Sequence, residues 1–330
     1  MILAQYRTAL LVPLALAGAD SPRARDPLLY CSNEVSNTIS VISPKTNTVI
    51  ATIPVGKRPR GMALSPDRRT VYVALGQDDA IGVIDVTKGA MTRTMPAGRD
   101  PELVAESPDG KTLYVSNEEI AHASGVDAAT GRMLFSTPVG VEPEGIGVSP
   151  DGSKVYVTAE TSNTVSVLDA RSGRLLRTIQ VGENPRTVAF TPDGRRAYVT
   201  AEAGGNVTVI DVATDSIVAQ FPIRDGKTKP VRIAFTPDGR YAYLTEGAAG
   251  TVSVLDVASG KVIDTIPVGR RPWGLALSPD GRRIYTADGR SNQVSVIDAA
   301  TRKVLATIPV GERPNDLLYI RNREGRVKES

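Results

Sequence analysis

The sequence predicts an all-β fold: a ring of seven four-stranded antiparallel blades, built from a repeat of about 42 residues. One sign of the repeat is a Ser/Thr-Pro-Asp turn, whose proline recurs at Pro66, Pro108, Pro150, Pro192, Pro237 and Pro279. Another is a tyrosine in the following apolar run, which recurs at Tyr30, Tyr72, Tyr114, Tyr156, Tyr198, Tyr243 and Tyr285. Seven repeats of this length, each holding several short strands, are typical of a β-propeller.

Each unit holds four short runs, illustrated by residues 61–64, 70–73, 165–168 and 49–53. Within each run apolar residues alternate with small or polar ones, as expected for a strand with two differently packed faces. The Ser-Pro-Asp-Gly turn joins the first two runs, because proline presets φ and glycine takes the positive φ that ends a tight hairpin. An Asp-x-x-Thr/Ser-Gly turn joins the last two, where the Asp side chain accepts backbone N–H groups.

The fourth run marks the outer edge of each blade. It carries a proline in six copies, at Pro54, Pro96, Pro138, Pro222, Pro267 and Pro309. Proline cannot donate to a central ladder, so this run is predicted to be an edge strand.

The two ends of the repeat region complete one blade. The region begins with the second run of a unit at residues 28–32 and ends with a first run at residues 316–320. Pairing them gives one composite blade beside six contiguous ones and removes the open edge of the ring. One copy departs from the pattern: residues 122–127 lack the usual Val-Ser-Val-Ile-Asp form, so that strand is expected to be thin or irregular.

The first residues of the chain differ from the repeats. Residues 1–19 are predicted to be a signal peptide, because Arg7 precedes an apolar run that ends in the small residues 17–19. This run is too short to span a bilayer, and Pro13 breaks it. The expected organisation is therefore a signal peptide cleaved near Ala19, a linker at 20–27, the propeller at 28–320 and a tail at 321–330, with a periplasmic location and no membrane span in the mature form.

Composition excludes several classes of partner and cofactor. With 41% hydrophobic residues the chain is expected to be soluble, and a net charge of +3 is too small an excess to indicate nucleic-acid binding. A monomer is expected. Its single cysteine, Cys31, cannot form an internal disulfide or a CxxCH haem site and is interpreted as a packing residue. His122 is the only histidine, so no cofactor and no metal site are predicted.

The candidate binding residues occupy repeat positions whose identity changes from copy to copy, because the blade itself does not dictate them. The position after the proline that opens each first run holds Arg60, Glu102, Glu144, Arg186, Val231, Trp273 and Asn315, followed by Arg232 and Asp316 in two copies. The loops between the second and third runs contribute Glu34, Glu118, Glu160 and Glu202.

These residues are expected to ring one mouth of the central channel. Mixed charges of this kind suit a protein partner or a small polar ligand. The alternative is that each charge is simply solvated, and Trp273 is either a contact anchor or a cap on the channel. Glu102 and Glu144 remain a possible acid and base pair, but catalytic motifs with a nucleophile are absent from the sequence.

Several segments resemble a known repeat family. Tyr114-Val115-Ser116-Asn117 and the Thr-Ile-Pro-Val-Gly runs resemble the YVTN family of β-propeller repeats over residues 28–320. More narrowly, residues 56–67, 100–118, 139–152 and 270–289 look like periplasmic propellers associated with pyrroloquinoline-quinone-dependent alcohol catabolism.

The resemblance implies a fold and a pathway neighbourhood, and it carries over no catalytic residues. The leading hypothesis is a non-catalytic periplasmic binding or accessory protein. The alternatives are a lactonase-type hydrolase, because several seven-bladed propellers of similar construction hydrolyse lactones, and a purely structural protein of the cell envelope.

Overall fold

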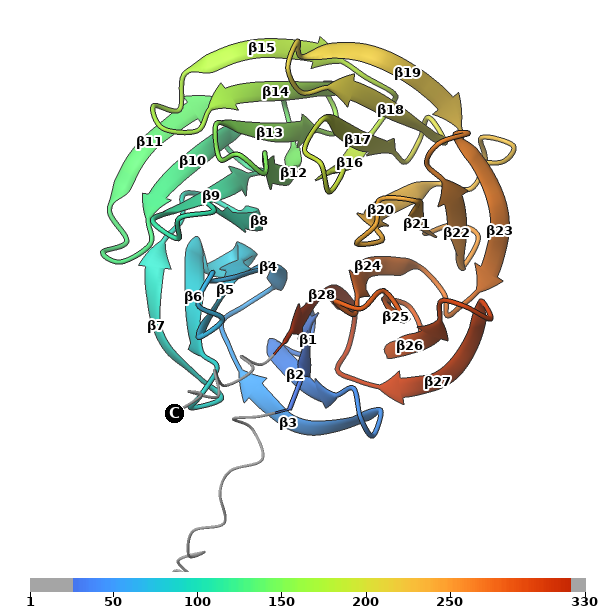
Figure 1. Cartoon of the computed structure of the whole chain (residues 1–330). Coiled ribbons are helices and arrows are strands. Elements are labelled where there is room, and N and C mark those ends of the chain that lie inside the picture. Colours follow the sequence, from blue (N-terminus) through green and yellow to red (C-terminus); the bar gives the residue numbers. More distant parts are fainter. Residues whose placement is uncertain (1–25, 322–330) are drawn as a thin grey trace, which may run out of the picture.

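Each sequence repeat folds into one antiparallel sheet, and seven such sheets surround a central channel in the computed structural model, which describes residues 26–321 (Figure 1). The predicted fold class is therefore confirmed. The predicted signal peptide, most of the linker and most of the tail lie outside the described residues. Within the described part of the chain, no helix has the length and apolar character needed to cross a membrane.

The strands of each blade follow one another from the channel outward. The first four blades are β28 (Pro314–Ile320), β1 (Leu28–Asn33), β2 (Thr38–Ser43), β3 (Thr48–Pro54); β4 (Pro59–Leu64), β5 (Thr70–Leu75), β6 (Ala80–Asp85), β7 (Ala90–Pro96); β8 (Pro101–Glu106), β9 (Thr112–Asn117), β10 (His122–Asp127), β11 (Met133–Pro138); and β12 (Pro143–Val148), β13 (Lys154–Ala159), β14 (Thr164–Asp169), β15 (Leu175–Gln180). The other three are β16 (Pro185–Phe190), β17 (Arg196–Ala201), β18 (Asn206–Asp211), β19 (Ser216–Pro222); β20 (Pro230–Phe235), β21 (Tyr241–Glu246), β22 (Thr251–Asp256), β23 (Lys261–Pro267); and β24 (Pro272–Leu277), β25 (Arg283–Asp288), β26 (Gln293–Asp298), β27 (Lys303–Pro309). One 3₁₀ turn, η2 (Gly76–Asp78), follows β5.

The apolar core lies between neighbouring blades. Seven clusters of buried side chains fill the seven seams, one cluster to each pair of blades. Alternate residues of one strand face opposite neighbours: Tyr30 packs into the seam with the β4–β7 blade, whereas Leu29 and Cys31 pack into the seam with the β24–β27 blade. Cys31 is fully buried, which confirms the packing role predicted for it.

The predicted closure of the ring is confirmed. β28 pairs antiparallel with β1, with Leu28 opposite Ile320 and Tyr30 opposite Leu318. The last strand of the chain therefore becomes the innermost strand of the blade that the first strands begin. No strand edge is left open where the two ends of the ring meet.

The prediction of a thin or irregular third strand in the third blade is wrong. β10 pairs with β9 without interruption, from His122 opposite Asn117 to Asp127 opposite Thr112. What differs is Gly125, which lies opposite Phe135 of β11. A Cβ atom at Gly125 would lie 2.3 Å from the Phe135 ring, so the ring occupies the space that a valine fills in the other blades.

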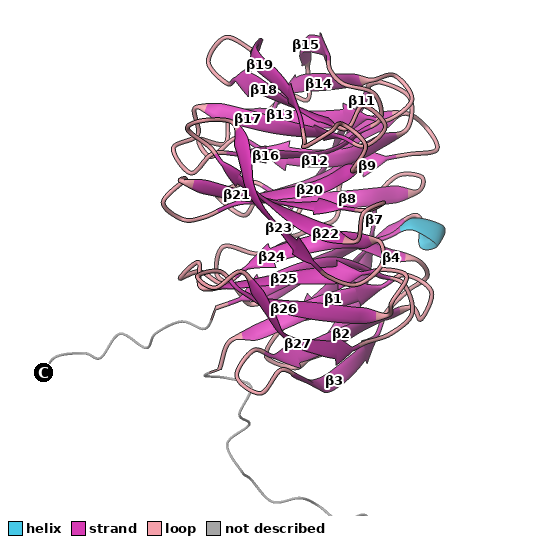
Figure 2. Ribbon diagram, turned by 90° about the vertical axis from the view of Figure 1, so that its right-hand side faces the viewer, coloured by secondary structure: helices cyan, strands magenta, loops and turns pink. Residues whose placement is uncertain are grey.

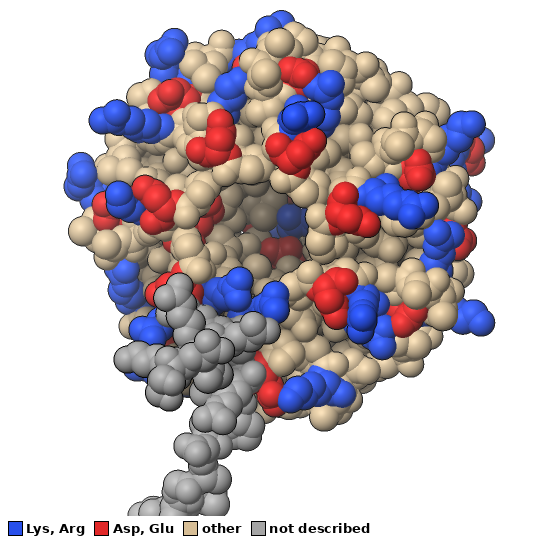
Figure 3. Space-filling view, viewed as in Figure 1, with Lys and Arg blue, Asp and Glu red and all other residues tan. Residues whose placement is uncertain are grey.

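The ring has two distinct faces. The Ser/Thr-Pro-Asp turns lie on one of them, which we call the turn face, and there Asp151 accepts hydrogen bonds from the Ser149 hydroxyl and the Ser153 N–H. The innermost strands begin on the opposite face, which we call the mouth face. In the side view of Figure 2 this is the side on which η2 lies, in cyan. Viewed from the turn face, the molecule is hollowed at its centre, and acidic and basic side chains lie at the bottom of the hollow (Figure 3).

Candidate functional site

A residue in left-handed conformation precedes every innermost strand at the mouth face. Each lies directly before the strand's first proline and has φ between 45° and 60°: Arg58, Asp100, Glu142, Asn184, Lys229, Arg271 and Arg313. Such φ values are uncommon for residues other than glycine. The carbonyl of each accepts an N–H from the loop between the second and third strands, as Asp100 does from Glu118 at 3.0 Å. Because this bond recurs in all seven blades, the backbone before each innermost strand is held in the same way, while the side chains there differ.

Charged side chains from six blades meet at this mouth in one connected network. We call it the mouth cluster and define it as Glu34, Arg58, Arg60, Asp100, Glu102, Glu118, Glu144, Glu160, Arg186, Glu202, Arg271 and Trp273. Seven carboxyl groups share four guanidinium groups in this set. The network therefore has an excess of acidic groups, most of them on the blades of β8–β15.

Two arginines, the buried Arg60 and the half-buried Arg186, connect the blades of the mouth cluster. The Arg60 guanidinium pairs with Glu102, and it lies 3.4 Å from a Glu34 oxygen. Arg186 bonds through Nη1 to Glu144 at 2.7 Å and through Nε to Glu202 at 2.6 Å. Arg271 then reaches Glu202 across the channel mouth, at 2.6 Å. Desolvated charges of this kind are tolerated because each has a partner of opposite charge.

Trp273 lies across the channel mouth. The guanidinium carbons of Arg271, Arg186 and Arg60 lie 4.5, 5.3 and 5.9 Å from the centre of its ring, and these three arginines come from three different blades. Cation–π attraction holds an arginine at such distances from an indole. Trp273 therefore joins arginines of three blades at the mouth.

Glu102 keeps its proton more firmly than an ordinary carboxylic acid. Burial raises its pKa well above the usual value, against the attraction of Arg60, and the charge of Glu144 raises it further. Burial also opposes ionisation of Glu118, but a hydrogen bond from Glu102 and the charges of Arg58 and Arg60 outweigh it and lower the Glu118 pKa. Burial thus favours the neutral form of Glu102, whereas the neighbouring groups favour the ionised form of Glu118.

Three carboxyl groups of the cluster lie close enough to be considered as metal ligands. Oxygens of Asp100, Glu102 and Glu118 lie within 4.8 Å of one another. The Arg58 guanidinium already contacts all three, at 2.8 Å from Glu102 and 3.5 Å from Glu118. The positive charge that this group of acids requires is supplied by Arg58, so the geometry assigns no metal here.

Nine of the eleven residues proposed as binding residues from the sequence belong to the mouth cluster. The other two lie beside it: Arg232 pairs with Asp316 at 3.2 Å, one residue further along the innermost strands, and Asn315 lines a pocket next to Trp273. Sequence reasoning missed Arg58, Asp100 and Arg271. Their signal was available, because the residue before the repeated proline also changes from blade to blade.

A pocket of about 220 Å³ opens at the mouth face, between the composite blade and the β24–β27 blade. We call it the Trp273 pocket; it is lined by Glu34, Arg60, Arg271, Trp273, Gly289, Arg290, Arg313, Pro314 and Asn315. Four arginines and one glutamate make this part of the mouth basic. Charge is therefore segregated around the ring, with acidic groups on one side and this basic pocket on the other.

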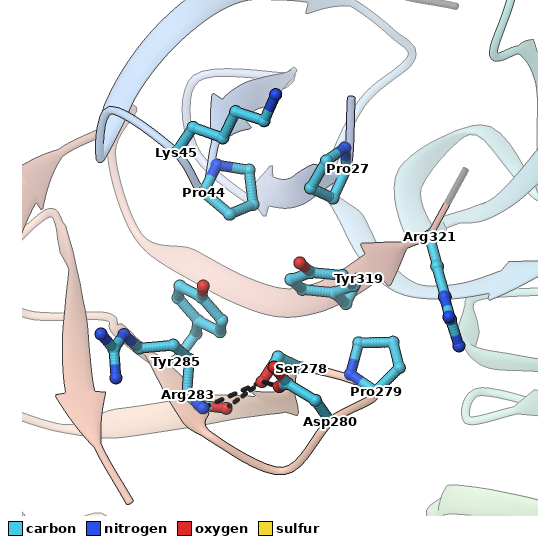
Figure 4. Close-up of a pocket in the computed structure, with 10 residues that line it drawn as sticks. All are labelled: Pro27, Pro44, Lys45, Ser278, Pro279, Asp280, Arg283, Tyr285, Tyr319 and Arg321. Carbon is cyan, nitrogen blue, oxygen red and sulfur yellow. Dashed lines mark hydrogen bonds between the residues drawn. The ribbon is translucent and has the colours of Figure 1, made fainter. Parts of the chain in front are cut away.

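A larger pocket of about 460 Å³ lies on the turn face at the same seam (Figure 4). The rings of Tyr285 and Tyr319, 5.9 Å apart, lie in it, and Lys45 and Arg283 also line it. A similar groove with Tyr243 lies at the preceding seam. Because the feature recurs between blades, we attribute it to blade packing rather than to a specific site.

The sheet order and the closing strand define this chain as a seven-bladed β-propeller, and its mouth is charged. Two family descriptions match parts of it: "Lactonase, 7-bladed beta-propeller" over residues 177–307, and "YNCE-like beta-propeller" over residues 5–123. No curated protein matches the chain.

Solved structures of the same architecture match nearly the whole chain. Hydrazine synthase of Kuenenia stuttgartiensis is 24% identical, with a TM-score of 0.77 over 88% of this chain and 99% of its own. A proposed 6-phosphogluconolactonase of Bacteroides uniformis is 18% identical, with a TM-score of 0.77 over 90% and 100%. A protein of unknown function from Desulfotomaculum acetoxidans is 16% identical, with a TM-score of 0.78 over 90% and 99%. At these identities the similarity is one of fold.

Proposed function

We propose that this propeller is a periplasmic, non-catalytic binding or accessory protein that works with a quinone-dependent alcohol oxidation system through its mouth face. The observation that carries the proposal is the mouth cluster. The same backbone hydrogen bond recurs there in every blade, whereas the charged side chains are specific to each blade. A surface that the fold does not require is free to serve recognition.

The chemistry of the mouth cluster favours binding over catalysis. Its carboxyl groups and guanidinium groups are paired with one another, and the cluster includes no histidine, cysteine or serine. Paired charges of this kind orient a partner and set the rate of association. The pathway assignment rests on the resemblance described for residues 100–118 and 270–289, two segments that carry Glu102, Glu118 and Trp273 of the cluster.

The experiment is capture of partners from periplasmic extract of cells grown on an alcohol, with the purified protein as bait. Glu102 and Glu144 are too buried for charge reversal, so the test variant is Glu118→Gln with Glu160→Gln, whose side chains are 27% and 19% exposed. The control is Glu183→Gln with Glu312→Gln, two exposed carboxylates outside the cluster.

The proposal expects a component of the alcohol oxidation system to be captured by the wild type and the control and lost with the test variant. Equal capture by all three proteins would show that the mouth cluster is not the binding surface. Capture of unrelated proteins alone would remove the pathway assignment.

A lactonase is the second candidate, favoured by the lactonase family match over residues 177–307 and by the opposite pKa shifts of Glu102, which is raised, and Glu118, which is lowered. A protonated acid beside an ionised one is a usual arrangement for acid and base catalysis. The two carboxyl groups lie outside the matched residues. Turnover of glucono-δ-lactone by the wild type, lost in Glu102→Gln, would favour the hydrolase over the binding protein.

A further inference from the structure

The Trp273 pocket lies at a repeat position that holds glutamate in four blades and glycine in three. The loop residue four places after the repeated tyrosine is Glu34, Glu118, Glu160 or Glu202 in four blades and Gly76, Gly247 or Gly289 in the others, and Gly289 is the glycine that lines this pocket. The Gly289 N–H bonds to the Arg271 carbonyl at 2.9 Å, the same bond that each of the four glutamates makes in its own blade. The position is therefore structurally equivalent, and the glycine places no carboxylate beside the arginines of this pocket.

Two of the four arginines in the pocket are not used by the mouth cluster. Arg60 and Arg271 are paired with Glu102 and Glu202. Arg313 is exposed and reaches only Glu34, at 4.0 Å. Arg290 is exposed as well, and its guanidinium makes no ion pair among residues 26–321. Arg290, which has no ion pair among these residues, and Arg313, whose ion pair with Glu34 is 4.0 Å long, thus flank a concave site that also presents an indole.

We propose that the Trp273 pocket binds a small organic anion, with its carboxylate or phosphate group on Arg290 and Arg313 and its apolar part against Trp273. The planar guanidinium fork matches both kinds of anion. A volume of about 220 Å³ admits a compact molecule and excludes a polymer chain. This inference rests on the proposal that the mouth face is the working surface, and it names the ligand chemistry of one part of that face.

The test is a titration of the purified protein, with benzoate and phenyl phosphate as the two anionic probes. Trp273 is the only tryptophan of the chain, so its intrinsic fluorescence reports on the pocket directly. Calorimetry gives an independent affinity. At low ionic strength we expect saturable binding of at least one anion, weaker binding of acetate, which lacks the apolar part, and none of benzylammonium, which has the opposite charge.

Two variants locate the binding. Arg290→Glu with Arg313→Glu should lower the affinity for the anion by about tenfold or more, because two charge-assisted contacts are lost. Gly289→Glu, which introduces the residue found in four of the other blades, should abolish binding by filling the pocket with a negative charge. The control is Arg171→Glu with Arg195→Glu, the same change of charge at exposed positions on the turn face, and it should bind as the wild type does.

The inference is overturned if neither anion binds, if benzylammonium binds more tightly, or if the Arg290 and Arg313 variant binds like the wild type. Acetate binding as tightly as benzoate would overturn the role of Trp273. The titration needs no protein partner, so it can fail while partner capture by the mouth cluster succeeds. The converse result, anion binding without partner capture, would contradict the proposed partner binding and support the anion site.

Discussion

Glu106 shows how one residue can conflict with its repeat. It ends the innermost strand β8, where the other six blades carry Leu64, Val148, Phe190, Phe235, Leu277 and Tyr319. Neither of its carboxyl oxygens has a hydrogen-bond partner. Burial, and then the charges of Asp67 and Asp109, raise the pKa of Glu106 to about 7. The ionised form is therefore penalised in the folded protein.

We expect stability to depend on pH through this residue. Since its pKa is higher folded than unfolded, Glu106 stabilises the fold most below about pH 4, and this contribution is lost as pH rises toward 7. Glu106→Leu should therefore be more stable than the wild type at pH 8, by about 1–2 kcal/mol after allowance for its half-exposed position.

The measurement for Glu106 is urea unfolding at pH 5 and pH 8. The gain in stability from Glu106→Leu should be larger at pH 8 than at pH 5, whereas Glu183→Gln, a change at an exposed carboxylate, should show no such difference. A gain that is the same at both pH values would mean that ionisation of Glu106 does not destabilise the fold.

At the scale of the element, the third strands of six blades share one residue pattern. The third strand of the remaining blade, β10, departs from it. Six blades carry valine at the position of Gly125, at Val41, Val83, Val167, Val209, Val254 and Val296. In β10 the valine is replaced by glycine, and Phe135 on the neighbouring edge strand fills the space. Two compensating changes thus keep the strand regular.

A double-mutant cycle measures this compensation. Gly125→Val alone should destabilise by about 1–3 kcal/mol, because the new side chain collides with the ring. Phe135→Ala alone should also destabilise, because it leaves a cavity beside Gly125. The double variant has the residues of the composite blade at both positions. Its loss of stability should be smaller than the sum of the losses in the two single variants. Simple additivity in thermal or urea unfolding would contradict the proposed packing.

At the scale of the whole molecule, the fold depends on closure. β28 supplies buried Leu317 and Ile320 to the seams on both sides of the composite blade. Each fully buried leucine or isoleucine contributes about 1.5–3 kcal/mol. The ring therefore gains stability from residues at the far end of the chain, and without β28 the strand β1 would expose an unpaired edge on the channel side.

Truncation tests the closure. Deleting residues 312–330 should lower the melting temperature by more than about 10 °C or prevent folding, because a loss of several kcal/mol is large against the usual stability of a domain. Deleting only residues 322–330 removes none of the described strands and should leave the melting temperature unchanged. Equal melting temperatures of the wild type and both truncated proteins would refute the role of β28 in stability.

Export is a property of the whole chain as well. The apolar run that ends at residues 17–19 predicts cleavage near Ala19, so the mature protein should begin near Asp20 and be found in the periplasm. Intact-mass measurement of the protein from periplasmic and cytoplasmic fractions checks both statements. A chain that keeps Met1 and stays in the cytoplasm would contradict them and remove the periplasmic part of the proposed function.

The sequence by itself determined the strands, the turns, the blade count and the closing pair of β1 and β28, because each is encoded by local patterns that recur seven times. It also placed Glu102, Arg186 and Trp273 at one mouth of the channel, since a repeat position maps to the same place in every blade. Only the tertiary structure decided how those side chains pair. Arg271 meets Glu202, and Trp273 meets Arg60, from blades that lie apart in the chain. Such contacts depend on the ring bringing distant residues together, and local pattern carries no information about distances across a channel.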